Sequence, residues 1–554
     1  MLNPSSAFRF YFDRFYIFSI FIVLPYYERF FSEDVLSGLG LIFCGLNTVP
    51  FIAIVTTEVK ISRLIGVICM VLLSLSIMFF ISFDFFRLLL CSNFIVLVLY
   101  VSSSKLIIQD SSSLAFLSFA SFAILQNNDG YFHNNGLSFI YLALLLPNVV
   151  YFYFNSHNVF KVLCFFLFVY LLTINESRLF VLSCLISVFY VFLIVYREHE
   201  HFKRLFVSSI IIVFVLFSFI ITNLKFSSTL GRFEIYKISL DMITDHPFSG
   251  IGFDSFKLHY NLYQASAVLN KSVMNDQLLN NTFFAINEYL QLIVELGIVG
   301  LILVGIYFCF VLRILKRLPA QVDNEDFVYK LFFAILSVLF LFSYCLHSLP
   351  LILLILTLIS LSRQENAVFF LKISKKYLWF IISFFLILFV FHVFLYFQLI
   401  NLQNSRSKSV KVDGYSTLYP FVFHNPVFLY NYGVQQWEKG EEEKALKTFL
   451  ECTTMLSHAD LYIYIGLCYQ KSKLYSQAEK YLNIARYMVP HKLYAKYCLM
   501  NLYIEKNECH KLIEIAKIIV EQDLKVYSML GMQIKDSAEF VLSNNKCLVQ
   551  TYGK

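Results

Sequence analysis

Charged residues are scarce in this chain. Asp, Glu, Lys and Arg together form 15% of its 554 residues, whereas soluble domains contain about 25%. Helix-breaking residues are few as well, with 10 Pro and 18 Gly, while hydrophobic residues form 58% of the chain and Phe alone occurs 63 times. The composition excludes an ordinary soluble domain and predicts an integral membrane protein. The net charge of +7 does not indicate nucleic-acid binding, because the Lys and Arg residues lie beside hydrophobic runs.

Sequence motifs for metal or nucleotide binding are missing too. The twelve cysteines show no CxxC pair and no metal-ligand spacing, so they are expected to fill apolar space. The segment HPFSGIGFDSF contains Pro247, Gly250 and Gly252 but no Lys-Ser or Lys-Thr pair after them. This pattern favours a tight structural turn over a phosphate-binding loop.

The long hydrophobic runs predict membrane-spanning helices. About 20 apolar residues cross a bilayer, and such a run must be helical there because its backbone polar groups need internal partners. The sequence therefore predicts an all-α fold, a polytopic transmembrane helical bundle of about 12–13 spans. The runs lie near residues 11–27, 35–57, 61–82, 85–103, 106–125, 137–154, 158–174, 179–196, 205–223, 287–315, 328–346, 348–362 and 377–400.

Basic residues predict the orientation of these spans. With a cytoplasmic N-terminus, most Lys and Arg fall in the inner loops, and the short outer loops hold only Arg29, Arg87 and Arg178. Cytoplasmic loops of membrane proteins carry this excess of positive charge. The large polar loop, 224–286, and the C-terminal tail are then expected on the outer side.

The C-terminal tail differs in composition and predicts a separate domain. We expect a transmembrane domain at 1–400, a linker at 401–424 and a helical-repeat domain at 425–554. Two segments of the tail match at an offset of 33 residues, which is the tetratricopeptide period, and such repeats stack into a curved surface. Gly433, Ala445, Phe449 and Cys452 then correspond to Gly466, Ala478, Leu482 and Ala485. An unrelated helical domain is the alternative.

Two outer arginines predict an anion site. Arg178 lies in the turn INESRLF between apolar spans, where a guanidinium group is costly without an anion. The alternative is a side chain that reaches the interface or pairs with Glu176. Arg232 lies in GRFEIYKISLDMI, whose apolar spacing suits a helix on the membrane surface. Guanidinium groups bind phosphate oxygens bidentately, so the pair predicts a diphosphate clamp.

Further polar residues are expected near that site. Asn287 opens the run at 287–315, and Glu288, Gln291 and Glu295 share one helical face. An acidic face on a membrane helix predicts a functional role, and internal pairing of Glu295 with an arginine is the alternative. Asn134 in the outer turn QNNDGYFHNNGLSF is a further expected site residue, although a polar turn needs no function.

In their order and spacing, these motifs resemble the O-antigen ligase, O-antigen polymerase and bacterial O-oligosaccharyltransferase superfamily. The resemblance covers about residues 120–362, and members with a C-terminal tetratricopeptide-like domain are familiar. The matching motifs are Gly130-x-Phe132-x-Asn134, Ser177-Arg178, Arg232, the P-x-x-G-x-G turn at 247–252, and NEYLQLIVELGIVGL at 287–301.

The resemblance implies an inverting, metal-independent glycosyltransferase without a cofactor. Such enzymes move a glycan from undecaprenyl diphosphate to an acceptor hydroxyl on the periplasmic side of the bacterial inner membrane. Arg178 and Arg232 match the arginines that hold the diphosphate in this family. No acidic DxD metal motif is required, and none occurs in the 224–286 loop. The implied partners are the lipid-linked glycan, membrane lipid and a glycan, lipid A-core or protein acceptor, with a protein partner at the repeats and no nucleic acid.

One position departs from the family pattern. Ligases and O-oligosaccharyltransferases carry His directly before the Asn-Glu pair, and this chain carries Ile286. A His near its working pKa would accept the proton of the attacking hydroxyl. Glu288, His246 and His259 are the expected substitutes, unless the reaction needs little base assistance. The departure favours a polymerase relative to a ligase or a protein-modifying enzyme.

Several functions stay open. An O-antigen ligase-like transferase leads, with an O-antigen or capsule polymerase and a protein O-oligosaccharyltransferase as alternatives. A polysaccharide transporter or flippase is more distant, because the spans show no internal repeat and no broken helices in matching halves. A membrane-anchored scaffold that works only through its repeats would leave Arg178 and Arg232 unexplained.

Overall fold

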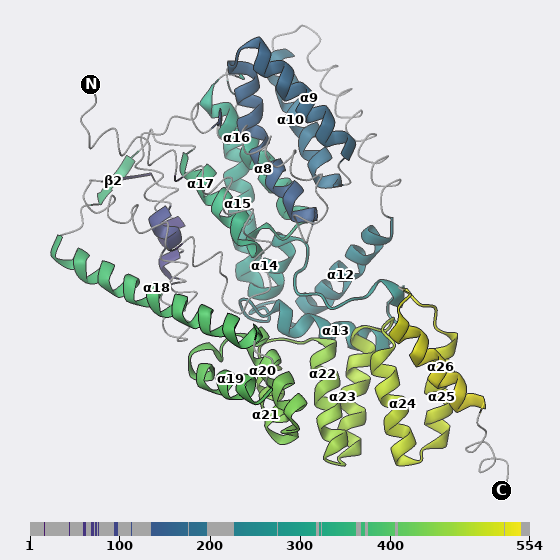
Figure 1. Cartoon of the computed structure of the whole chain (residues 1–554). Coiled ribbons are helices and arrows are strands. Elements are labelled where there is room, and N and C mark those ends of the chain that lie inside the picture. Colours follow the sequence, from purple (N-terminus) through teal and green to yellow (C-terminus); the bar gives the residue numbers. More distant parts are fainter. Residues whose placement is uncertain are drawn as a thin grey trace. The chain divides into compact units, whose positions relative to one another are not determined.

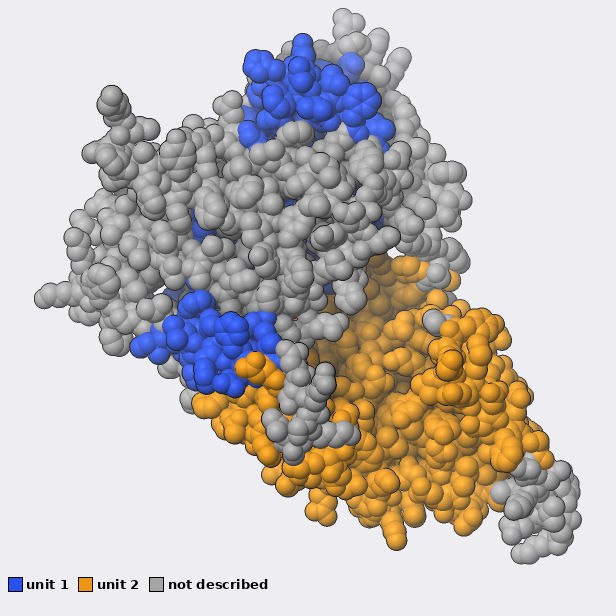
Figure 2. Space-filling model, viewed as in Figure 1, with its two compact units in different colours: residues 1–224, 306–400 blue, residues 225–305, 401–554 orange. Residues whose placement is uncertain are grey.

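The chain forms two compact units in the computed structural model. One comprises residues 1–224 and 306–400, and the other comprises residues 225–305 and 401–554 (Figure 2). The polar loop therefore belongs to the same unit as the tail. The described residues are 135–174, 177–196, 226–316 except 274, 324–361, 367–371, 375–404 and 408–543 except 526, with a few short stretches besides (Figure 1).

The first unit contains a bundle of apolar helices. The run Tyr141–Leu146 in α8 (Asn135–Asn155) is at most 2% exposed, as expected for a helix with neighbours on all sides. Among the described helices, α8 packs against α9 (Asn158–Ile174), α10 (Arg178–Tyr196), α16 (Glu325–Phe342) and α17 (Leu349–Leu361).

Two described helices are long and apolar enough to cross a membrane, namely α10 and α15 (Ile298–Leu315). Helices α9 and α15 expose large apolar side chains such as Phe166 and Ile306. Exposed apolar surface of this extent is typical of contact with lipid or another chain. The expected spans from 11–27 to 106–125, and the one at 205–223, lie almost entirely outside the described residues.

The described structure is helical, as predicted, apart from one short β-ribbon. Strand β1 (Val59–Ser62) pairs antiparallel with β2 (Ala367–Leu371), and Val59 lies opposite Leu371. The segments VKIS and AVFFL are rich in the β-branched and aromatic residues that favour strands. Strand β1 lies where the predicted span 61–82 begins, and β2 lies between the predicted spans 348–362 and 377–400. The rest of the described regular structure is helical.

The predicted span at 287–315 is not one helix. It divides at Gly297 into α14 (Glu288–Leu296) and α15. Gly297 adopts φ +58°, and a Cβ atom there would lie 2.5 Å from the carbonyl oxygen of Phe248. Only glycine combines this backbone conformation with so close an approach. The apolar pattern continues through the break, which is why the sequence predicted a single span.

Three helices of the second unit build its polar segment. Helices α12 (Phe226–Asp245), α13 (Phe256–Leu269) and α14 enclose a small core that includes Met242 and Tyr260. A single 3-10 turn, η2 (Asp276–Leu278), follows α13.

Helical hairpins form the tail. A Cβ on Gly433 would lie 2.5 Å from the Phe449 ring, and one on Gly466 would lie 2.6 Å from Leu482. These two contacts are 33 residues apart. The expected linker 401–424 is mostly helical, because α18 (Lys375–Asn404) is followed by α19 (Lys408–Val422). The hairpin helices are α20 (Pro426–Lys439), α21 (Glu442–Cys452), α22 (Ala459–Lys471), α23 (Tyr475–Met488), α24 (Tyr494–Lys506), α25 (Cys509–Glu521) and α26 (Met529–Ser543).

Helix α13 packs on the hairpins, mainly on α23 (Figure 1). The buried Asn261 side chain donates to the Ser457 carbonyl at 2.6 Å and accepts from the Thr282 amide at 2.9 Å. The buried Gln264 side chain donates to the Met488 carbonyl at 2.5 Å. Buried amides that satisfy backbone groups are costly to remove, so these contacts join the polar segment firmly to the tail.

Candidate functional site

The glycine turn between α12 and α13 lies across the end of α14. The Ile251 amide donates to the Val294 carbonyl at 3.1 Å, and the Gly252 amide donates to the Glu295 carbonyl at 3.0 Å. Gly250 adopts φ +64°, and a Cβ there would lie 2.2 Å from the Glu295 carbonyl oxygen. The segment is thus a tight structural turn, as predicted.

Glu295 holds this turn through its carboxylate. Its side chain accepts from the backbone amide of Asp254 at 3.0 Å and that of Phe256 at 3.4 Å. Burial raises the pKa of Glu295, and these hydrogen bonds partly oppose the shift. Gln291 donates to Glu295 at 3.1 Å and accepts from the Ala285 amide at 3.1 Å. Backbone amides and Gln291, rather than an arginine, are therefore the observed partners of Glu295.

A second network brings Arg232 to the start of α14. Tyr236, one turn after Arg232 on α12, donates to the Ile286 carbonyl at 3.3 Å and shares a hydrogen bond with the Asn287 side chain. Burial raises the pKa of the Tyr236 phenol, while the Arg232 charge and the Asn287 bond act to lower it. Asn287 also caps α14, because its side chain accepts from the Leu290 amide at 3.0 Å.

This corner combines a helix N-terminus, the charge of Arg232 and one carboxylate. The N-terminus of a helix carries partial positive charge and unpaired amide donors, and it favours anions. The Arg232 charge lies close enough to Tyr236 to lower its pKa, and Tyr236 contacts this helix start. Glu288 is the first residue of α14 and is buried at 8% exposure. The structure therefore gathers Arg232, Asn287 and Glu288, with Gln291 one turn further along α14.

Ile286 has a strained backbone at this corner. Its φ is +54°, a conformation in which a β-branched residue is a genuine outlier. Strain of about 1–3 kcal/mol persists only where neighbouring contacts enforce it, and it concentrates at functional sites. The Tyr236 bond to the Ile286 carbonyl is one such contact. This position is the one at which the family pattern has His.

Arg178 belongs to the other compact unit. It is the half-buried first residue of α10. A cation at a helix N-terminus opposes the helix dipole, which makes an anion more favourable there. The clamp formed by Arg178 and Arg232 together stays a prediction, since each arginine is described within its own unit.

The remaining predicted residues lie apart from the Tyr236 network or outside the described chain. His246 is exposed directly after α12, and His259 is half-buried on α13 with Nδ1 3.1 Å from the Ser255 carbonyl oxygen. Asn134 lies outside the described residues. No group of His, Cys, Asp and Glu suited to a metal ion occurs in the described part of the chain.

Sequence reasoning missed Tyr236, which it treated only as part of an apolar helix face. Its place four residues after Arg232 was the available signal, because residues i and i+4 are neighbours on a helix. No pattern in the sequence indicates its contact with residues 286 and 287, which lie some fifty positions away.

In its described residues the chain is mainly helical, two of the helices are long and apolar enough to cross a membrane, and Arg232 lies near a helix N-terminus in the polar segment. Residues 163–305 match a family model described as O-antigen ligase, and this stretch includes Arg178, Arg232 and all of α14. The match supports a glycosyltransferase-type enzyme of polysaccharide or lipopolysaccharide synthesis, of ligase or polymerase kind. A search of curated proteins gave no match.

Proposed function

We propose that this protein transfers a glycan from undecaprenyl diphosphate to an acceptor hydroxyl on the periplasmic side of the bacterial inner membrane. One observation carries the proposal: the stretch that matches the O-antigen ligase model contains both predicted diphosphate-binding arginines and the α14 corner. Two of these features, Arg232 and the start of α14, are connected through Tyr236.

In the proposed transfer reaction, the arginines stabilise the leaving diphosphate and one side chain accepts the proton of the acceptor hydroxyl. The acceptor oxygen attacks the anomeric carbon opposite to the diphosphate, the bond from that carbon to the diphosphate oxygen breaks, and configuration inverts. The bonding electrons pass to the diphosphate, whose growing charge Arg178 and Arg232 stabilise. The hydroxyl proton passes to a base, for which Glu288, His246 and His259 remain the candidates. Glu288 is favoured because it lies at the Arg232 corner.

The finer type of transferase is also a proposal. We place ligase-like activity first, with an O-antigen or capsule polymerase and a protein O-oligosaccharyltransferase as alternatives. The 33-residue spacing of the Gly433 and Gly466 contacts supports a tetratricopeptide-like tail. Such tails present surfaces for a protein partner or acceptor. We place the tail and the large loop in the periplasm, following the charge asymmetry of the loops.

Complementation of a gene deletion tests the donor site. Surface polysaccharide and glycoproteins are profiled after complementation with wild type, Arg178→Ala, Arg232→Ala and the exposed control Arg313→Ala. Each site variant is expected to lower glycan transfer on the order of 100-fold or more, while the control restores it. If both site variants restore the glycan at normal protein level, the clamp is wrong.

The same deletion separates the alternatives. Loss of a ligase leaves long chains on the lipid carrier, and loss of a polymerase leaves single repeat units transferred. Loss of a protein-modifying enzyme removes glycan from proteins alone. Comparison of Glu288→Gln, His246→Ala and His259→Ala identifies the base. Unchanged turnover in all three would mean that none of these side chains accepts the proton.

A further inference from the structure

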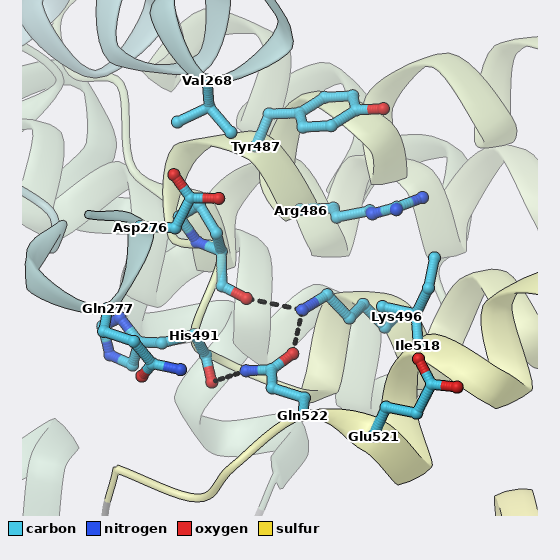
Figure 3. A pocket seen from close by; sticks show the side chains of 11 residues that line it. Val268, Asp276, Gln277, Arg486, Tyr487, His491, Lys496, Ile518, Glu521 and Gln522 are labelled. Atoms are coloured by element: carbon cyan, nitrogen blue, oxygen red, sulfur yellow. Dashed lines mark hydrogen bonds between the residues drawn. The ribbon is translucent and has the colours of Figure 1, made fainter. Parts of the chain in front are cut away.

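A cavity of about 350 Å³, lined by charged, amide and apolar side chains, lies within the second unit. The chain after α13 supplies Asp276 and Gln277, and the hairpins supply Arg486, Tyr487 and Glu521 among others (Figure 3). The cavity is lined by residues from segments more than two hundred positions apart, which meet because α13 packs on α23. Its volume falls in the range of about 300–1,000 Å³ that is usual for small-ligand sites.

A buried lysine, Lys496, lines the cavity and bonds to two neighbouring segments. Lys496 is 5% exposed and donates from Nζ to the Pro490 carbonyl at 2.5 Å and to the Gln522 side-chain oxygen. Gln522 in turn donates to the His491 carbonyl at 2.7 Å (Figure 3). An ammonium group has three N–H donors, and these two protein acceptors occupy two of them. The Lys496 ammonium group is thus held in a fixed place at the cavity.

Among the side chains that line the cavity the charges balance, while Lys525 and Lys492 lie near His491 outside the lining. Arg486 and Lys496 carry two positive charges, and Asp276 and Glu521 carry two negative charges. Burial, together with the nearby charge of Lys525, lowers the pKa of His491 to about 4, so this ring is neutral at neutral pH. The carboxylates of Asp276 and Glu521 repel a phosphate or another anion, because charges of the same sign disfavour binding. The lining suits a neutral ligand with many hydroxyl groups.

A hydroxyl group can both donate and accept hydrogen bonds, and the cavity lining offers partners for both. Carboxylates accept from a hydroxyl, while Arg, Lys and the amide of Gln277 donate to it. The Tyr487 ring adds an aromatic surface, with the Arg486 guanidinium carbon 5.3 Å from its centroid. The electron-rich face of such a ring attracts the C–H groups of a sugar.

We propose that this cavity binds one or two neutral sugar residues. That these sugars belong to the glycan being transferred rests on the proposed function. The cavity would then hold part of the donor or acceptor chain away from the reacting bond and set which glycans the enzyme accepts.

Sugar binding by the full-length protein in lipid nanodiscs tests the inference. Saturation-transfer NMR is recorded with a set of neutral disaccharides of hexoses and N-acetylhexosamines, with uronic-acid analogues, and with inorganic phosphate as competitor. Binding of a neutral disaccharide is expected. Gln277→Ala and Tyr487→Ala should weaken it at least ten-fold, and the isosteric change Glu521→Gln several-fold. Tyr494→Ala, an exposed tyrosine outside the cavity, is the matched control.

Several outcomes overturn the inference. The inference is wrong if no neutral disaccharide binds, or if phosphate displaces the sugar. It is also wrong if the protein prefers the uronic acids, or if Tyr494→Ala weakens sugar binding as much as the cavity variants do. Asp276→Asn, also isosteric and exposed, tests the site without disturbing packing. Arg232→Ala should keep full sugar binding. If Arg178→Ala and Arg232→Ala restore normal glycan, the transferase proposal fails, while a measured sugar site stands. If these variants lose glycan transfer but no sugar binds to the protein, only the proposed sugar site is wrong.

Discussion

At the scale of the residue, Ile286 and Tyr236 together define the corner at the start of α14. A β-branched residue at φ +54° stays there only if neighbours enforce it. The Tyr236 bond to the Ile286 carbonyl and the Asn287 cap of α14 are the observed restraints. We propose that Tyr236 is a positioning residue, which acts through Ile286 and Asn287 on the proposed transferase site.

Tyr236→Phe removes the hydroxyl group and keeps the ring. We expect glycan transfer to fall about ten-fold, which corresponds to about 1.4 kcal/mol, the size of a net hydrogen bond. Acceptor-dependent transfer in nanodiscs measures it, with amide exchange at 286–290 as the readout of position. Tyr263→Phe, which loses a 2.9 Å bond to Asp245, is the matched control. Equal loss in both variants would contradict a positioning role.

His491 makes the stability of the second unit depend on pH. Burial and the neighbouring Lys525, Lys492 and Lys496 lower its pKa to about 4, while a bond to the Leu279 carbonyl acts in the opposite direction. The unfolded state has a pKa near 6.5, so it binds more protons between these values. The stabilising contribution is complete above pH 6.5 and is lost as the pH falls to about 4.

Thermal unfolding of the full chain between pH 4 and 7.5 checks this dependence. We expect wild type to lose on the order of 1 kcal/mol over the acidic interval, after allowance for solvent screening. His491→Asn should flatten the curve. A wild-type profile that coincides with that of the variant would exclude His491 as the titrating group.

At the scale of the element, close backbone approach decides where helices end. The break at Gly297 and the turn at Gly250 face each other: a Cβ on Gly297 would lie 2.6 Å from the Gly250 amide nitrogen. The amphipathic α14 and the apolar α15 can separate because this contact needs no side chain. Glu295 then secures the turn through Asp254 and Phe256.

Gly250→Ala tests this packing, with Gly231→Ala as its control. Alanine at position 250 would be strained at φ +64° and would meet the Glu295 carbonyl at 2.2 Å. We expect destabilisation of about 2–4 kcal/mol, measured by thermal unfolding and by faster amide exchange at Ile251 and Gly252. Nothing lies within 4 Å of a Cβ on Gly231. Its helical position should gain about 0.5–1 kcal/mol with alanine. Comparable stability of the two variants would refute the argument.

At the scale of the whole molecule, the polar segment and the tail act as one unit. Asn261 and Gln264 join α13 to the hairpins by buried hydrogen bonds to backbone carbonyls. The cavity beside them exists only because of this contact. A tail joined in this way is well placed to influence the polar segment, whereas a tail on a free linker would not be.

Replacing both side chains, Asn261→Ala with Gln264→Ala, should loosen the contact. Each unsatisfied buried partner costs about 1–3 kcal/mol, so amide exchange at Thr282 and along α23 should rise at least about ten-fold. Ser537→Ala is the control, because the Ser537 hydroxyl donates to the Gln533 carbonyl on its own helix, α26. Unchanged exchange in the double variant would mean that these side chains do not hold the segment to the tail.

The sequence by itself determined the features that depend on near neighbours or on a fixed period. Apolar length predicted α8, α9, α10, α16 and α17, and the 33-residue offset predicted the contacts of Gly433 and Gly466. Glycine and proline predicted the turn at 247–252. Arg178 and Arg232 were selected by their charge beside apolar spans, and the family match over 163–305 includes both.

Only the tertiary structure decided how distant segments use these residues. It joined Asn261 to Ser457 across 196 positions, turned Gln291 and Glu295 inward to hold the glycine turn, and linked Tyr236 to the strained Ile286. It also paired β1 with β2 and divided the expected span at Gly297. Such contacts depend on which surfaces meet after the helices form. A pattern of neighbouring residues determines the helices themselves, but it contains no record of which distant partner each helix will meet.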